Sequence, residues 1–341
     1  MKGQHSKLIN WLYAGAIIIL IQVSLGGITR LSDAGLSMTQ WNIVKGSKPP
    51  MNATEWQNAF DRYKTIPQFK ALHEDMTING FKEIYFWEYT HRMWGRLVFA
   101  FFFFLFAIAA IRKKLPKGFF LHGVLLSLLI AAQGVLGWIM VKSGLSENIY
   151  VSHYRLTAHL VLALVAFCYN MWLIYKLKYS PSPNKKLNSL VWVTTAIAFV
   201  QLIYGGFMAG TKAAGFYPSW PLMNGKYVPS NLFSMSNWFA NFFDNVNMIQ
   251  FIHRNVAIVL FVMAIYTGVK AMKANQKISG ILLHAIIFFQ FMLGIITVMM
   301  AQPDVPVLWG LLHQLGGFVL FAVLTRLVYV SSSNKATSLS C

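Results

Sequence analysis

The amino-acid sequence predicts an all-α integral membrane protein whose eight transmembrane helices form two parallel-repeat four-helix bundles. Three observations lead to this fold class. Hydrophobic residues make up 56% of the chain and charged residues 11%, which is the composition of a membrane protein rather than of a soluble domain. Eight apolar runs are each long enough to cross a bilayer. The second half of the chain also repeats features of the first half.

The predicted spans are joined alternately by short basic loops and by loops that carry the acidic residues. The spans cover residues 8–29, 85–111, 118–141, 154–175, 187–210, 247–269, 278–301 and 306–329. Two of the acidic loops, 30–84 and 211–246, are longer than a simple connection requires. We therefore expect each of these two loops to act as a lid over a site.

The distribution of charge predicts the orientation in the membrane. Fifteen Lys and Arg residues lie in or beside the loops of one side, where no acid occurs, and all ten Asp and Glu residues belong to the other side. Because basic loops stay in the cytoplasm, we expect both termini in the cytoplasm, with a bacterial inner membrane as the simplest location. The net charge of +19 reflects this bias, so no nucleic-acid partner is expected.

The two predicted bundles cover residues 1–178 and 187–330, and a Ser-rich tail, 331–341, is expected to be disordered. Because each half holds an even number of spans, both halves enter the membrane from the same side and are parallel repeats. The matching stretches are Gly26-Gly27 with Gly205-Gly206, and Gln133-x-x-Leu-Gly137 with Gln290-x-x-Leu-Gly294.

A single histidine lies near the start of each even-numbered span, and these histidines are His91, His159, His253 and His313. Histidine is costly inside a bilayer and usually has a function there. All four should lie at a similar depth near the outer face, each alone on its helix. Two six-coordinate hemes need this arrangement, with one imidazole from each of two facing helices. The sequence therefore predicts these four residues as heme-iron ligands.

Two other roles remain open for these histidines. A tetrahedral zinc site usually draws its ligands from close spacing, and a lone histidine often only forms hydrogen bonds between helices. Four histidines in duplicated register favour heme. His153 competes with His159, but aligning His159 with His313 places His153 on Val307, so His153 is more consistent with an outer hydrogen-bonding role.

Four arginines lie close to the histidines in sequence, and these are Arg92, Arg96, Arg155 and Arg254. Arginine binds carboxylates through two parallel hydrogen bonds, so we expect these residues to bind heme propionates. Snorkelling to the outer headgroups is the alternative. Glycines in the spans allow either close helix packing or room for a flat macrocycle, and the sequence does not separate these two roles.

The two halves differ in charge near their histidines. Glu88 shares a helix face with His91, whereas its counterpart in the second half is the neutral Gln250. Likewise, the counterparts of Arg96 and Arg155 in the second half are the uncharged residues Ile258 and Trp309. The first half therefore carries a candidate acid or base, Glu88, and the second half is typical of a cytochrome b site. The alternative for Glu88 is a surface salt bridge with the Arg92 side chain.

The chain resembles the heme A synthase family over nearly its whole length. The stretches that carry the resemblance are GGITRLSDAGLSMTQW (26–41), EYTHRMWGR (88–96), QGVLGWIMVKSGL (133–145), VSHYRLTAHL (151–160), QFIHR (250–254) and the HQ pair at 313–314. Some members of the family carry a cysteine pair in the first outer loop. Residues 30–84 contain no cysteine, so the chain is similar to the subclass without that pair.

The resemblance implies oxidation of the C8 methyl of heme O to a formyl group, which gives heme A for cytochrome oxidase. It also implies that His253 and His313 hold a heme b, that His91 and His159 flank the substrate heme O and the product heme A, and that Glu88 is important. The implied partners are a heme O synthase that delivers the substrate and an unidentified electron donor or acceptor.

A non-enzymatic diheme cytochrome b that passes electrons from quinol to a partner is the alternative function. It explains the four histidines equally well. It does not explain why only the first half carries Glu88, nor the length of the first outer loop.

Overall fold

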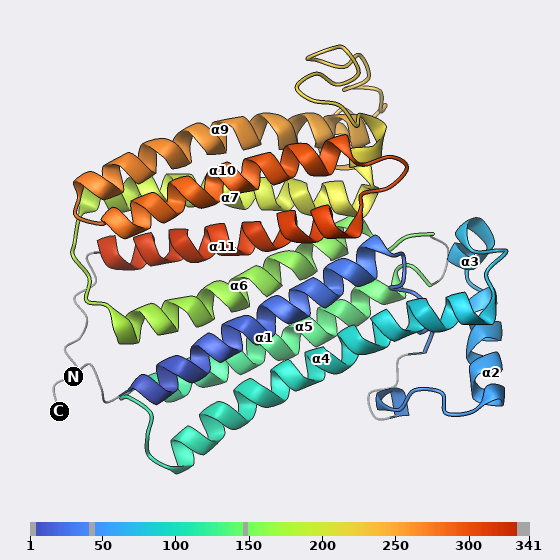
Figure 1. Cartoon of the computed structure of the whole chain (residues 1–341), viewed down its shortest axis with the longest axis horizontal. Helices are drawn as coiled ribbons and strands as arrows, with labels where there is room; N and C mark the ends of the chain where they lie inside the picture. Colours follow the sequence, from blue (N-terminus) through green and yellow to red (C-terminus); the bar gives the residue numbers. More distant parts are fainter. Residues whose placement is uncertain (1–4, 41–44, 146–148, 333–341) are drawn as a thin grey trace.

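The structure is a computed structural model that describes residues 5–40, 45–145 and 149–332 (Figure 1). Its long helices are α1 (Ser6–Leu31), α4 (Ile78–Ile111), α5 (Phe119–Lys142), α6 (His153–Lys178), α7 (Lys185–Thr211), α9 (Val246–Lys273), α10 (Lys277–Met299) and α11 (Val307–Ser331). Within the described residues, these eight helices are long and apolar enough to cross a membrane. The predicted all-α membrane fold with eight spans is confirmed. The tail that is expected to be disordered lies outside the described residues from position 333 onward.

The predicted spans agree with the helices to within a few residues, except at the start of α4. This helix begins at Ile78 rather than at residue 85. Its first turns carry Lys82 and Glu83, so they lack the hydropathy of a bilayer segment, yet Phe81 and Ile84 are buried there. The helix therefore continues beyond the apolar run because a second, smaller core stabilises its first turns.

That smaller core is formed by two short helices in the first outer loop, which the sequence analysis treated only as a lid. Helices α2 (Ala53–Lys64) and α3 (Pro67–Leu72) follow a short 3-10 turn, η1 (Lys45–Ser47). The side chain of Asn52 caps α2 by accepting a hydrogen bond of 2.9 Å from the backbone N–H of Glu55. Aromatic rings of α2 and α3 pack on those of α4, and these rings are Phe60, Tyr63, Phe69, Phe81 and Tyr85.

The second outer loop contains the 3-10 turn η2 (Ala213–Phe216) and the short helix α8 (Asn241–Asp244).

The long helices pack as two groups of four. In the first half, α1 and α5 each contact both α4 and α6; in the second half, α7 and α10 each contact both α9 and α11. The halves meet through α6 with α7 and α11, and through α1 with α11. Figure 1 shows the two groups of four helices side by side, with both long loops at the same end.

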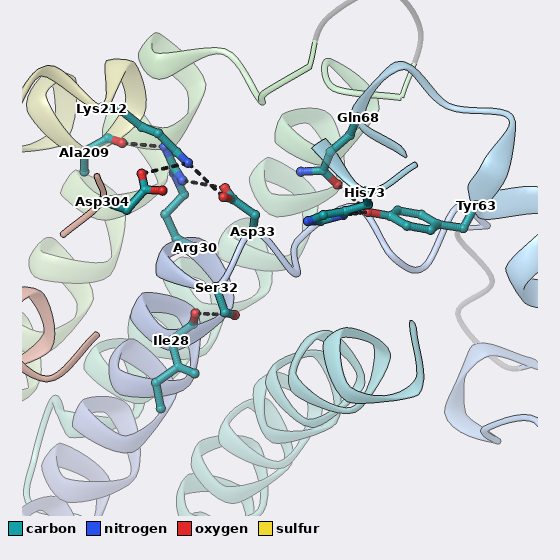
Figure 2. Close-up of polar contacts among 10 residues, drawn as sticks. All are labelled: Ile28, Arg30, Ser32, Asp33, Tyr63, Gln68, His73, Ala209, Lys212 and Asp304. Atoms are coloured by element: carbon teal, nitrogen blue, oxygen red, sulfur yellow. Dashed lines mark hydrogen bonds and ion pairs between the residues drawn. The ribbon is translucent and has the colours of Figure 1, made fainter. Parts of the chain in front are cut away.

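An ionic cluster joins the two halves at this outer end (Figure 2). The Lys212 ammonium lies 2.8 Å from one Asp33 oxygen and 3.2 Å from Asp304, and Arg30 donates to the carbonyl of Ala209 at 2.6 Å. Burial disfavours the charge of Lys212, but its hydrogen bonds to the two aspartates outweigh this effect and raise its pKa. The alignment of Gly26 with Gly205 also matches position 33 with 212 and position 30 with 209, so equivalent positions of the two repeats bind one another.

His73, just after α3, is partly buried and forms a hydrogen-bonded chain with two buried side chains of the same core (Figure 2). The Tyr63 hydroxyl donates to Oε1 of Gln68 at 3.1 Å and lies 2.6 Å from Nδ1 of His73. Burial lowers the pKa of His73 below its ordinary value of 6.5; the Asp33 carboxylate opposes this shift and the Lys212 ammonium adds to it. His73 is therefore neutral in the folded outer core.

We predict that the outer core loosens as the pH falls below 6.5. Because the folded pKa of His73 is depressed, the unfolded segment binds more protons than the folded one in that range, so stability falls with falling pH and is complete above 6.5. Hydrogen exchange of α2 and α3 at several pH values measures this effect. His73→Asn should remove most of the pH dependence; equal exchange rates at all pH values in the unmodified protein would contradict the prediction.

Candidate functional site

The four predicted ligands lie on alternate membrane-spanning helices, namely His91 on α4, His159 on α6, His253 on α9 and His313 on α11. The last three lie six or seven residues after the start of their helices, which is about 10 Å along the helix axis. His91 lies further into its helix because α4 begins outside the apolar run. These positions support the common depth that the sequence predicts.

A glycine of a neighbouring helix lies against each histidine ring. A Cβ atom built on the glycine would lie 2.9–3.3 Å from Cε1 of its histidine, in the pairs Gly26–His91, Gly137–His159, Gly205–His253 and Gly294–His313. Such distances are shorter than ordinary van der Waals contact, so a larger residue would displace the ring or separate the helices. These four glycines therefore set the position of the rings.

The second glycine of each Gly-Gly pair has a different neighbour, in the opposite half. A Cβ atom on Gly27 would lie 2.7 Å from Oε1 of Gln314, and one on Gly206 would lie 2.5 Å from Oγ1 of Thr157. Small residues let membrane helices approach closely. Gly27 and Gly206 thus allow α1 and α7 to pack against the other half.

A glutamine precedes each histidine-facing glycine by four residues, and these glutamines are Gln22, Gln133, Gln201 and Gln290. The side chains of Gln22 and Gln201 lie 3.2 and 3.1 Å from the ring nitrogens of His91 and His253. Those of the other two donate to the backbone carbonyls of the remaining histidines, at 3.0 and 2.9 Å. The spacing Gln-x-x-x-Gly occurs in all four odd-numbered spans, so it is a sequence signal for all four glutamines and not only for Gln133 and Gln290.

The two histidines of the second half face one another. The ring centroids of His253 and His313 are 6.5 Å apart, with 78° between the ring planes. Metal–imidazole bonds are about 2 Å long, so two axial imidazoles on one iron have centroids roughly 6 Å apart. The Nδ1 atoms of both rings are buried and have no hydrogen-bond partner within the described part of the chain.

In the first half, Nδ1 of His159 is likewise buried without a partner among the described residues. In the same part of the chain, no group of three or more His, Cys, Asp and Glu side chains is arranged to hold a metal ion.

Glu88 is buried, with 3% of its side chain exposed, rather than lying at the surface. One carboxylate oxygen forms an ion pair with Arg92, and the other accepts hydrogen bonds of 2.7 Å from the Ser37 hydroxyl and the Met38 backbone N–H. The predicted pairing with Arg92 is therefore present, but it lies in the interior. The pair fixes the start of the first outer loop, because Arg92 also donates to the carbonyl of Met38 at 3.1 Å.

The second half anchors its outer loop in a similar way without a carboxylate. Gln250, the counterpart of Glu88, donates to the carbonyl of Tyr217 at 3.0 Å, and Arg254 donates to the same carbonyl at 2.5 Å. The Arg254 guanidinium also lies 5.9 Å from the centroid of the Trp220 ring. In both halves, the residues flanking the histidine in sequence therefore bind loop backbone.

The remaining candidates have separate environments. Arg96 contacts the sulfur of Met93 at 3.1 Å, and Arg155 donates to the carbonyl of Ile139 at 2.9 Å. His153 lies 3.0 Å from the carbonyl of Phe243, at the outer end of the bundle. This contact agrees with the hydrogen-bonding role that the sequence suggests for His153.

Comparison with known proteins gives a consistent result over most of the chain. Residues 9–325 match the family model COX15-CtaA, described as cytochrome oxidase assembly protein. A heme A synthase of Flavobacterium psychrophilum is 38% identical over 95% of this chain and 98% of that protein. The heme A synthase of Flavobacterium johnsoniae is 35% identical with the same coverage, and that of Paracoccus denitrificans is 35% identical over 95% of this chain and 88% of its own length. On this similarity and on its eight apolar helices, the chain belongs to the COX15-CtaA family of cytochrome oxidase assembly proteins.

Proposed function

We propose that this protein is a heme A synthase, which oxidises a methyl group of heme O to the formyl group of heme A. The observation that carries the proposal is the unit of histidine, glycine and glutamine that occurs twice in each half, since among the described residues only the first half has a buried carboxylate, Glu88, near it. The names of the relatives, which are 35–38% identical, support the same activity.

In the proposed arrangement, the chain forms two parallel repeats, residues 1–178 and 187–330, and the second repeat holds a resident heme b. Its rings, His253 and His313, whose centroids lie 6.5 Å apart, would hold the heme iron, and the glycines beside them leave room for no larger side chain. The unpaired buried Nδ1 atoms are further polar groups that a bound cofactor and its surroundings would engage. A heme b held there would supply one-electron transfer.

The first repeat is the proposed substrate half, where His91 and His159 flank heme O. Where it differs from the second repeat, this half carries charged residues: Glu88 stands in place of Gln250, and Arg96 in place of Ile258. Oxidation of a methyl group removes protons as well as electrons. The buried Glu88 carboxylate is the group of this half that accepts a proton or stabilises positive charge near His91.

The four arginines are proposed to bind heme propionates. Arg254 has the clearest capacity, since its Nε is buried and forms no hydrogen bond to the described residues. The Arg155 guanidinium is exposed near the start of α6. Arg92 and Arg96 both lie on α4, close to His91 in sequence. A guanidinium matches a carboxylate group with two parallel hydrogen bonds.

The proposed location is a bacterial inner membrane, with both termini in the cytoplasm and the outer core on the opposite side. Heme O would reach the first half within the same membrane from a heme O synthase. An electron donor or acceptor would complete the reaction.

We predict that His253→Ala and His313→Ala each remove the low-spin heme b spectrum while the protein still inserts into the membrane, because either change deletes one axial ligand. Absorption spectra of the purified variants measure this. His284→Gln is the matched control, since His284 lies in the same half but contacts the carbonyl of Ile265 instead. A normal bis-imidazole spectrum in both alanine variants would show the assignment to be wrong.

We predict that Glu88→Gln lowers heme A formation by about 10²–10⁴-fold, as is typical of general acid–base groups, without preventing heme O binding. Glutamine keeps the size of the side chain and its acceptor for Ser37 and Met38, but it removes the charge. Heme extraction and separation would then show accumulated heme O or a partly oxidised heme.

The matched control for this variant is Glu55→Gln, which alters an exposed carboxylate in the same outer segment. Heme A formation should stay normal there. If Glu88→Gln also forms heme A at a normal rate, Glu88 only holds Arg92 and the outer loop in place.

A further inference from the structure

The two halves differ at one further position, on the third span of each repeat. The alignment of Gln133 with Gln290 and of Gly137 with Gly294 places Gly134 opposite Phe291. Both positions lie one turn from a histidine-facing glycine, and Phe291 contacts Phe261 on the second span of its half. One half therefore has the smallest residue at a point where the other has a large aromatic residue.

In the second half, Phe291 closes the seam between α9 and α10. Its ring centroid lies 5.0 Å from that of Phe261 on α9 and 5.7 Å from that of Trp220 in the outer loop. Trp220 is held in turn beneath Arg254, which binds the carbonyl of Tyr217. The loop thus covers the seam through an edge-to-face contact between Trp220 and Phe291 and a tilted contact between Phe291 and Phe261.

In the first half, the alignment places the exposed Gly134 at the position that corresponds to the α9–α10 seam. Among the described residues, nothing outside its own helix lies within 4 Å of a Cβ atom built there. Phe99, the counterpart of Phe261, is 39% exposed and stacks on Phe103 of its own helix rather than on α5.

We propose that the α4–α5 seam at Gly134 is the lateral passage through which heme O enters the first half from the bilayer and heme A leaves it. The proposal rests on the proposed function, because a substrate site must exchange its heme whereas a resident cofactor must not. An apolar macrocycle in the membrane reaches a bundle through its side, and a glycine gives the width for a flat ring. The aromatic seal at Phe291 keeps the resident heme in the second half.

The test uses full-length protein in lipid nanodiscs, isolated from cells that make no heme O. Heme O is added and its binding is followed by absorbance. Gly134→Phe should slow uptake by about tenfold, because an aromatic residue in the seam raises the barrier to passage, and should leave the final amount of bound heme O unchanged. Val135→Phe, which changes the adjacent lipid-facing residue, 57% exposed, should bind heme O at the normal rate.

Normal uptake by Gly134→Phe would overturn the proposal. A smaller final amount bound at a normal rate would also overturn it, because Gly134 would then line the site rather than the passage. If the unmodified protein itself takes up no heme O, the proposed substrate half is wrong, and this outcome is distinct from a failure of the passage alone.

The second half allows an independent experiment that requires no heme O. Phe291→Gly should open the α9–α10 seam, so that heme b transfers to added apomyoglobin about tenfold faster than from the unmodified protein. If Phe291→Gly loses heme b at the same rate as the unmodified protein, Phe291 does not retain the heme, and the proposed difference between the two seams is wrong.

Discussion

The contact between a histidine ring and a glycine on the neighbouring helix determines the geometry of both sites. In all four pairs, the ring approaches so closely that a single added carbon would collide with it. Close packing replaces the hydrophobic effect as the force between helices in a bilayer, so each glycine also fixes the distance between two helices. The glutamine one turn earlier adds a hydrogen bond to the ring or backbone of the same histidine. A repeated local unit thus positions polar rings in an apolar environment.

On this common scaffold, the chemistry of the halves is separated by a few substitutions near the outer end. Glu88 and Gln250 both hold an outer loop, but only Glu88 introduces a negative charge, which its Arg92 partner and two hydrogen-bond donors stabilise in the interior. The ionic cluster of Asp33 and Lys212 joins equivalent positions of the repeats. In the proposed function, the repeated unit supplies two sites, and differences near the loops give those sites different roles.

The sequence predicts the eight spans because bilayer helices are continuous apolar runs, and it predicts the histidines because a polar residue in such a run is conspicuous. It misses the helices in residues 53–72, since they pack outside the membrane and lack that signal. It also leaves the roles of Gly26 and Gly205 open, because only three-dimensional contacts distinguish a ring neighbour from a helix neighbour. Gln22 and Gln201 were detectable from their spacing to these glycines, whereas the burial of Glu88 depends on a loop whose path the sequence does not reveal.

We propose that one half of the chain holds a resident heme and that the other half holds a heme that is converted. Extraction and identification of the hemes in the purified protein, from cells that make heme O, would separate these two roles. We expect heme b together with heme O or heme A in the same polypeptide. Heme b alone would contradict it and would favour a cytochrome b that only transfers electrons.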